Sequence, residues 1–299
     1  MDEDRLLTER FEEHRPHLRA VSYRMLGSIS EAEDALQEAW LRLERTDISE
    51  VENLGGWLTT VVTRLCLNML RAREQRREDP LEIRMPDPVI GREGVIDPER
   101  EVLLADSVGL ALLVVMESLS PAERIAFVLH DMFAVPFDEI APVIEKSTAA
   151  TRQLASRARR RVQGQAPAPD RDLVRQRAAV DAFFAASRDG DFEALVAVLD
   201  PDVVLRSDGV VGRVRQAVVL NGARTVASQA VMYSSLAPFV RPALVNGAAG
   251  VVVVADGRTL SVMAFTVVGG KVVAIDVLTD PERLAGLDLA GVDLAGLGD

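Results

Sequence analysis

The side chains best suited to chemistry lie in a basic stretch between Lys146 and Val162. No acidic residue occurs between Lys146 and Asp170. Small or apolar residues recur every four positions along this stretch, at Ala150, Leu154, Ala158 and Val162. The remaining faces of a helix would then carry hydroxyl, amide and guanidinium groups, which bind base edges and phosphates. The pattern favours contact with DNA, although a solvated basic face on an ordinary helical hairpin has the same composition.

The elements that would position this helix favour the DNA interpretation. Ile140, Ala141, Val143 and Ile144 give a preceding short helix one apolar side. A polar break follows, and Ser147 or Thr148 can cap the next helix by accepting a hydrogen bond from a free backbone N–H. A short helix packed across the start of a basic helix is the helix-turn-helix arrangement, whose second helix enters the major groove.

Composition limits what this chain can do alone. The net charge of −12 over 299 residues argues against a general nucleic-acid coat protein. One basic helix in an acidic protein should bind DNA weakly without a partner that supplies further positive surface. The single cysteine, Cys66, lies in an apolar run and is expected to be a buried structural thiol. One cysteine excludes an intramolecular disulfide and a cysteine-rich zinc site. We also expect no other metal site and no cofactor.

No hydrophobic segment indicates a membrane or secretory protein. The first residues are charged, without the apolar core of a signal peptide. No stretch approaches 18 apolar residues without charge, so no membrane span is expected. These features predict a cytoplasmic protein.

Three helices are expected in the first quarter of the chain, over residues 6–26, 30–45 and 57–76. Ser30 and Glu33 have the spacing of a capping box at the start of the second helix. The second helix is acidic, the third ends in a basic run, and a loop with Asn53 and two glycines separates them. Each helix alone would be an ordinary member of a bundle; their order carries more information.

The stretches 30–43, 56–58 and 62–71 together resemble region two of extracytoplasmic-function (ECF) sigma factors. The helix-turn-helix, with Leu119–Arg124 ahead of it and Ser156–Arg161 at its close, resembles their region four. Two such motifs in the right order are more specific than one. The resemblance covers about residues 5–163 and implies a transcription initiation factor rather than an enzyme.

The resemblance also implies partners and contact residues. Core RNA polymerase would bind through its β′ clamp helices and its β flap. The first of these contacts would be made by Asp34, Gln37, Glu38 and Arg42. Promoter DNA would be contacted at the −10 element, one base being flipped from the non-template strand, by Asn53, Arg64, Asn68 and Arg71. The −35 element would be contacted by Thr148, Thr151, Arg152, Gln153 and Ser156, with Arg157 and Arg160 on phosphates.

The second half of the chain differs in composition and pattern. Helices are expected over 173–188, 192–199 and 223–236, and β-strands over 203–206, 218–220, 239–245, 249–255, 259–268 and 271–277. Asp256-Gly257 and Gly269-Gly270 supply hairpin turns. The predicted fold class is multidomain: two all-α domains, the second with the helix-turn-helix, followed by an α+β cone that resembles SnoaL-like proteins.

The expected boundaries follow from proline- and glycine-rich stretches. We predict a first domain over 1–77, a linker over 78–101, a second domain over 102–163 and a short linker over 164–171. The cone would span 172–279 and a tail 280–299. The first linker is expected to be extended, either as a stiff spacer or as a bound segment.

The combination of domains resembles one group of ECF sigma factors with a fused SnoaL-like extension. Three short motifs of that group have degenerate counterparts here, one of them in the linker. The regulatory contacts implied by these counterparts involve Pro86, Asp87, Pro88, Asp208, Gly209, Gly212, Asp280, Pro281, Arg283 and Leu284. The extension would then regulate the sigma core in cis, without a separate anti-sigma factor.

Two alternatives remain open for the cone. It could be an enzyme, since some SnoaL-like proteins are, with Asp208, Asp256 and Asp276 as candidate acids; turn or surface roles are the plainer interpretation of these aspartates. It could also be a sensor that binds a small-molecule ligand in its pocket without converting it.

Overall fold

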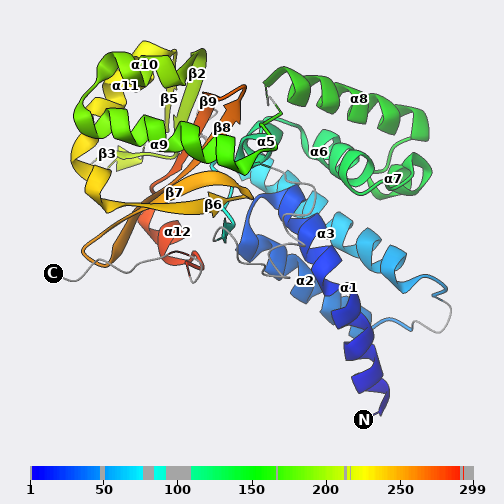
Figure 1. The fold of residues 1–299 in the computed structure, drawn as a ribbon. Coiled ribbons are helices and arrows are strands. Elements are labelled where there is room, and N and C mark those ends of the chain that lie inside the picture. Colours follow the sequence, from blue (N-terminus) through cyan, green and yellow to red (C-terminus); the bar gives the residue numbers. More distant parts are fainter. Residues whose placement is uncertain are drawn as a thin grey trace. The chain divides into compact units, whose positions relative to one another are not determined.

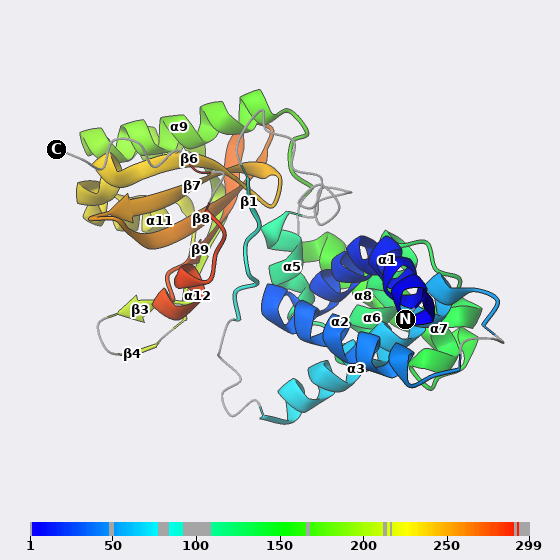
Figure 2. The ribbon, with the colours of Figure 1, turned by 90° about the horizontal axis from the view of Figure 1, so that it is seen from below.

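The computed structural model describes residues 2–47, 51–76, 84–91, 109–165, 168–211, 214–215, 217–289 and 292. Two compact units make up the chain. The first contains the described residues up to 76 and those from 115 to 165. The second contains residues 84–91, the start of α5 and the described residues from 168 onward. The multidomain fold class predicted from the sequence is confirmed (Figures 1 and 2).

The first unit begins with three packed helices, α1 (Asp2–Leu26), α2 (Ile29–Glu44) and α3 (Leu54–Arg76). The apolar side of α2 is buried, as its spacing predicts. Two details of the prediction are wrong. The N-cap of α2 is Ser28 rather than Ser30, without a side-chain cap bond. Helix α3 begins at Leu54 rather than Trp57, because the side chain of Asn53 accepts a hydrogen bond from Gly56 N at 2.9 Å and so closes the first turn.

The helix-turn-helix region follows. It begins with α5 (Leu110–Met116), whose start belongs to the second unit. The elements that lie in the first unit are α6 (Pro121–Phe127), a π-helical turn (Val128–Met132), α7 (Phe137–Val143) and α8 (Thr148–Gln165). A capping box between Ser120 and Glu123 starts α6. Ser147 Oγ accepts a hydrogen bond from Ala150 N at 3.2 Å, so Ser147 is the residue that caps α8.

The buried face of α8 is rotated from the predicted one. Its buried residues are Thr151, Ala155, Ala158 and Val162, whereas Ala150 and Leu154 are only partly buried. A strict four-residue series drifts by about 40° per step on a helix of 3.6 residues per turn. Spacings of four, three and four residues stay on one face, and the structure follows them.

Helices from both halves of the first unit pack against one another. The guanidinium of Arg24 lies 4.8 Å from the centroid of the Phe133 ring, and the ring of His17 meets the same phenyl ring edge-on at 5.3 Å. Glu117 pairs with Arg124 at 2.6 Å and approaches Arg73 of α3 at 3.8 Å. These contacts join the three-helix bundle to the helix-turn-helix.

The second unit is an α+β domain. Among the described residues its main sheet has the strand order β1-β6-β7-β8-β9-β2-β5. The strands are β1 (Ile90–Gly91), β2 (Leu199–Ser207), β5 (Val218–Asn221), β6 (Val240–Val245), β7 (Ala248–Ala255), β8 (Arg258–Val268) and β9 (Lys271–Leu278). β2 and β9 run parallel and the other pairs antiparallel. A separate small hairpin joins β3 (Val210–Val211) to β4 (Val214–Arg215).

One face of this sheet carries the helices. α9 (Leu173–Asp189), α10 (Phe192–Val198), α11 (Ala223–Met232) and a 3₁₀ turn (Ser234–Phe239) pack with that face around a core that includes Phe183 and Phe265. A short helix, α12 (Pro281–Ala285), packs against β8 and lies on the other side of the sheet from α9 in Figure 2. The expected hairpin turns at Asp256-Gly257 and Gly269-Gly270 are present, and all four residues have positive φ.

Candidate functional site

The acidic helix α2 presents the predicted polymerase-contacting residues on its outer side. Asp34, Gln37 and Arg42 are exposed, and Glu38 is partly buried. Glu38 accepts a hydrogen bond from Arg42 Nε at 3.0 Å, one helical turn later. The chain therefore places these four side chains together on one exposed helix face.

Helix α3 carries the residues predicted to face the −10 strand. Arg64 and Asn68 are exposed and Arg71 is partly buried. Their spacing of four and then three residues places them on one side of the helix. Asn53 lies at the start of the same helix, where its carboxamide oxygen is already engaged by Gly56 N. To contact a base, Asn53 would have to use its amide NH₂ group, or its oxygen would have to give up the hydrogen bond from Gly56 N.

Helix α8 carries the residues predicted to contact the −35 element, and their exposure differs. Arg152, Gln153, Ser156 and Arg160 are exposed, and Thr148 is partly exposed. Thr151 is fully buried, and its hydroxyl donates to the carbonyl of Ser147 at 3.0 Å. A buried side chain cannot meet a base edge, so the prediction of a base contact for Thr151 is wrong. Its hydroxyl instead ties the first turn of α8 to the residue that caps it.

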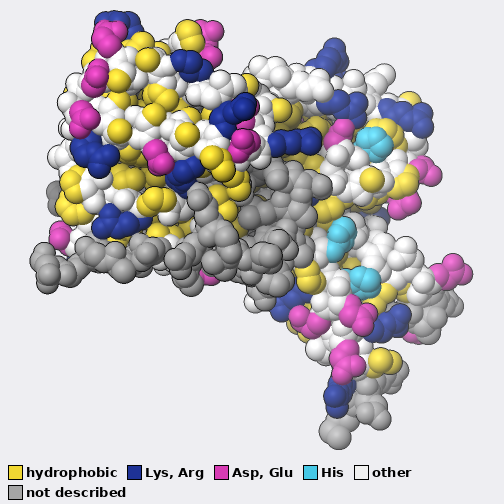
Figure 3. All heavy atoms as spheres, in the orientation of Figure 1, with side chains coloured by type: hydrophobic (Ala, Val, Ile, Leu, Met, Phe, Trp, Pro, Cys, Tyr) yellow, Lys and Arg dark blue, Asp and Glu magenta, His cyan; other side chains and the backbone are white. Residues whose placement is uncertain are grey.

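The side chain of Arg157 is exposed, and it also has a partner within the chain. Its Nε donates to Glu123 at 3.1 Å, and Arg161 approaches the same carboxylate at 3.4 Å. Burial opposes ionisation of Glu123, but hydrogen bonds from Ser120 and Arg157 outweigh it and hold the pKa of Glu123 below its usual value. Basic side chains are nevertheless visible over α8 in Figure 3, so this helix keeps a positive outer surface.

The described part of the first linker, residues 84–91, is bound to the second unit as an edge strand. Ile90 pairs with Val245 and Gly91 with Leu244, antiparallel. Asn246 completes the pairing, because its carboxamide oxygen accepts from Val89 N at 3.1 Å and its own N–H donates to Val89 O at 2.9 Å. Of the two alternatives for the linker, the bound segment is the one observed.

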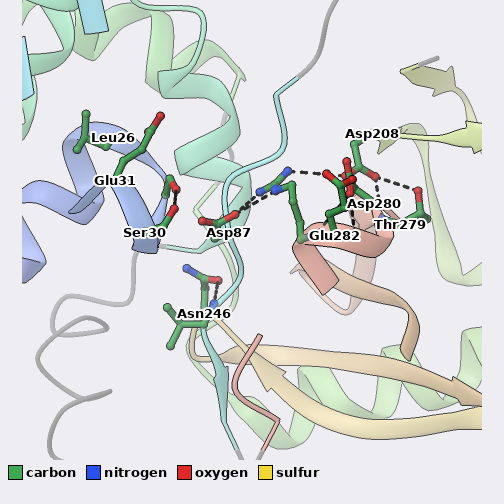
Figure 4. A network of polar contacts seen from close by, with 12 residues as sticks. Leu26, Ser30, Glu31, Asp87, Asp208, Asn246, Thr279, Asp280 and Glu282 are labelled. Atoms are coloured by element: carbon green, nitrogen blue, oxygen red, sulfur yellow. Dashed lines mark hydrogen bonds and ion pairs between the residues drawn. The ribbon is translucent and has the colours of Figure 1, made fainter. Parts of the chain in front are cut away.

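A second contact holds the same linker segment from α12. The guanidinium of Arg283 donates to the Asp87 carboxylate, with Nε at 3.1 Å from Oδ1, and lies 3.7 Å from Asp208 Oδ2. Asp208 Oδ1 in turn accepts from the Thr279 N–H at 2.7 Å and the Thr279 hydroxyl at 3.0 Å (Figure 4). We refer to Asp87, Arg283, Asp208 and Thr279 as the linker clamp.

The other predicted regulatory residues lie around this clamp. Asp280 caps α12 by accepting from Glu282 N and Arg283 N, which fixes the helix that carries Arg283. Leu284 is buried and Pro281 is exposed. Pro86 and Pro88 are buried, and Gly209 has a positive φ of 37° next to Asp208. Gly212 lies outside the described residues.

Two residues of the linker site were missed from the sequence. Thr279 gave no signal beyond its place before Asp280. Asn246-Gly247 is a strong hairpin-turn dipeptide, and both residues have positive φ. That signal could have located the turn, although not the linker strand that the turn holds.

Two of the candidate acids of the cone are held in contacts with neighbouring side chains, and the third lies in a turn. Asp276 is buried and paired with Arg206 at 2.7 Å; burial raises the pKa of Asp276, and the neighbouring guanidinium opposes that shift. Asp208 belongs to the linker clamp and Asp256 to an exposed turn. The described residues contain no cluster of three or more metal-binding side chains. No described helix is long and apolar enough to cross a membrane.

Both helical parts of the chain match known protein families. Residues 10–77 match the model of sigma-70 region 2, and residues 109–162 match that of sigma-70 region 4. The chain is 38% identical over 308 residues to the ECF RNA polymerase sigma factor SigJ of Mycobacterium tuberculosis, with 93% of each chain covered. It is 36% identical over 272 residues to the probable ECF RNA polymerase sigma factor SigI of the same species, covering 91% of this chain and 92% of SigI.

A solved structure extends the similarity to the whole fold. The crystal structure of Mycobacterium tuberculosis SigJ superposes with a TM-score of 0.77 at 35% identity, covering 94% of this chain and 99% of SigJ. The similarity therefore includes the C-terminal α+β domain as well as the two helical domains.

Proposed function

The chain belongs to the ECF RNA polymerase sigma factors, and from that premise we propose that it directs core RNA polymerase to specific promoters under the control of its own C-terminal domain. Sigma factors act by binding, so the proposed role needs no catalytic residue. The promoter-contacting domains would be residues 1–77 and 102–163. The two linkers would keep the limits predicted from the sequence, whereas the tail predicted over 280–299 would begin after α12, which packs against β8.

Each exposed face has one partner in this proposal. Asp34, Gln37, Glu38 and Arg42 on α2 bind the β′ clamp helices, while the second domain binds the β flap. Arg64, Asn68 and Arg71 follow the −10 strand, and Asn53 supports a flipped base. On α8, Thr148, Arg152, Gln153 and Ser156 meet the −35 base edges and Arg160 a phosphate. Arg157 reaches a phosphate after leaving Glu123.

The bound linker is the observation that supports regulation in cis. The linker joins the two domains that must reach the −10 and −35 elements together. Pairing of Ile90 with Val245 and of Asp87 with Arg283 ties that linker to the C-terminal domain. The clamp and the linker belong to one chain, so each meets the other at a high effective concentration. Even a weak contact between them can therefore be well populated. We propose that the clamp restrains initiation and that its release allows both domains to engage the promoter.

The enzyme alternative for the C-terminal domain has little support from its chemistry. A carboxylate base in the pocket would be required. None of the described residues that line the apolar cavity between α9, α11 and the sheet is acidic, and Asp276 is paired with Arg206. A separate anti-sigma factor and an enzymatic activity are both unnecessary to the proposal.

Run-off transcription with core RNA polymerase tests the proposal. The full chain should initiate from a promoter selected out of a random library, and Gln153→Ala should relax that selectivity at one −35 position. Arg283→Ala should raise the initiation rate. Failure of the folded full chain to direct any specific initiation would overturn the promoter-directing role. A lower rate for Arg283→Ala would show instead that the clamp belongs to the active form.

A further inference from the structure

The C-terminal domain contains a cavity of about 370 Å³ on the helix-bearing face of its sheet. It adjoins the core and is lined by residues of α9, α11 and the 3₁₀ turn together with residues of β2, β5, β8 and β9. Its volume is within the range of ~300–1,000 Å³ that holds small-molecule ligands. We infer that this cavity binds one uncharged, mainly apolar molecule with a hydrogen-bonding oxygen at one end, and that its binding loosens the linker clamp.

The lining determines the chemical class of the ligand. Phe183, Phe184, Leu205, Leu220 and Met263 line the cavity, and no described lining residue carries a charge. A charged ligand would lose its hydration there without receiving an ion pair, which is costly. An uncharged molecule of similar shape would gain from burial of its apolar surface.

Two hydroxyl groups on the wall can receive the polar end of such a molecule. Ser261 on β8 is 8% exposed, and no hydrogen bond of its hydroxyl occurs among the described residues. Thr279, at the end of β9, lines the same cavity. Both hydroxyls can donate to a carbonyl, ether or alcohol oxygen.

Thr279 connects the cavity to the linker. Its hydroxyl has one hydrogen, which it now donates to Asp208 at 3.0 Å. A ligand oxygen at Thr279 would compete for that hydrogen and leave Oδ1 of Asp208 with the Thr279 N–H alone. Asp208 also attracts Arg283, the partner of Asp87. Occupation of the cavity would therefore disturb the clamp, a consequence that rests on the regulatory role proposed above.

Thermodynamic linkage gives this coupling a reciprocal form. If the ligand weakens the clamp, breaking the clamp must strengthen ligand binding by the same factor. Asp87 does not line the cavity, so Asp87→Asn can test this without altering the binding surface.

The first experiment measures binding to the full chain with 6-propionyl-2-(dimethylamino)naphthalene, an uncharged fluorescent ketone. Its emission should shift to the blue and saturate at one molecule per chain. The matched 6-(dimethylamino)naphthalene-2-carboxylate should bind at least about tenfold more weakly, because its charge is not compensated. Met263→Trp should fill the cavity and remove the signal. Ser261→Ala keeps the shape of the cavity and should weaken ketone binding; it provides the test if the tryptophan variant does not fold. Equal binding of ketone and carboxylate, or full ketone binding by both variants, overturns the site.

The second experiment measures the coupling by hydrogen exchange at the Val89 amide. Saturating ketone should speed this exchange by about fivefold or more, and Asp87→Asn should tighten ketone binding by the same factor. Ketone binding without either change overturns the coupling. Arg283→Ala, studied without ketone, tests the clamp itself: if it changes exchange and initiation while the ketone does not bind, only the cavity inference fails.

Discussion

Arg283 donates to the carboxylate of Asp87 across 196 positions of sequence, and it does so from a helix that Asp280 caps. The side chains of Arg283 and Asp87 are 27% and 16% exposed, so solvent screens the pair only in part. Arg283 also lies near Asp208 and therefore links two acids, one in the linker and one at the end of β2. This arginine thus adds a side-chain contact to the β1–β6 pairing that also holds the linker.

Removing either partner should release the linker. We expect Arg283→Ala and Asp87→Asn each to destabilise the linker contact by about 1–3 kcal/mol, since each removes a charge-assisted hydrogen bond. The double variant should lose much less than the sum of the two, because both changes break the same interaction. Hydrogen exchange at Val89 and Ile90 in the full chain reports the free energy of opening.

A matched control is available in the same domain. Arg258 is an exposed arginine at the start of β8, and Arg258→Ala changes the net charge equally. It should leave exchange at Val89 unchanged. Equal effects of Arg258→Ala and Arg283→Ala would mean that general charge, rather than the clamp, sets the linker's stability.

The carboxamide of Asn246 provides an independent test of the edge strand. Asn246 has a φ of 51°, which glycine adopts without strain, so Asn246→Gly removes the side-chain bond to Val89 and preserves the turn. Loss of this bond should cost about 0.5–1.5 kcal/mol and speed exchange at Val89 roughly 2- to 13-fold. The exposed turn residue Asp256 also has a φ of 51°, so Asp256→Gly is the control for the added backbone freedom and should leave this exchange unchanged. Unchanged exchange in Asn246→Gly would contradict the role of its side chain.

Local patterns predicted the elements of this protein better than their pairings. The β-rich runs within residues 249–277 and the two glycine-containing turns were sufficient to predict the hairpins formed by β7, β8 and β9. The bound linker strand could not be predicted in this way. β1 has two residues, and its polar partner Asn246 lies 157 positions from Val89. The register of β1 depends on pairing with a strand far away in the sequence. Such pairing produces no local hydrophobic pattern from which it could be predicted.

The contact residues on α8 show a different limit. Composition identified the helix and its arginines, but the assumed spacing assigned Thr151 to the wrong face. Burial of Thr151 with Ala155 follows from the geometry of a straight helix. The resemblance of the chain to a family supplied the partners, which side-chain types alone could not have named.

Thr151 and Gln153 should therefore behave oppositely when replaced. Thr151→Val keeps the shape but loses the bond to Ser147, so it should lower the free energy of unfolding by about 0.5–1.5 kcal/mol. Gln153→Ala changes an exposed side chain and should leave stability within about 0.5 kcal/mol. In promoter binding, only Gln153→Ala should relax base preference at one −35 position. Loss of base preference in a fully stable Thr151→Val variant would restore Thr151 as a reader.

Cys66 should be inert in the folded protein. It is fully buried on α3, and burial raises the pKa of its thiol to about 12. Reaction with an aromatic disulfide reagent at pH 8 should be limited by unfolding and should become rapid in denaturant. Fast reaction without denaturant would show that α3 opens locally, because only an exposed thiolate can attack the reagent.

Acidification should weaken the first unit through His17. His17 is exposed, but its ring packs edge-on against Phe133. The desolvation of the ring lowers the pKa of His17, and the positive charges of His14 and Arg24 lower it further. The folded state therefore binds a proton less readily than the unfolded chain, whose histidine titrates near pH ~6.5. The stabilising contribution of the neutral His17 is complete above that pH and declines as the pH falls toward the folded-state pKa.

Urea unfolding of the full chain at pH 7.5 and pH 5.5 tests this. Between the two pH values, His17→Leu should lose less free energy of unfolding than the unaltered chain. Because other groups titrate in the same window, the difference between the two proteins is the diagnostic quantity. An identical loss in both would exclude His17 as a source of the acid sensitivity.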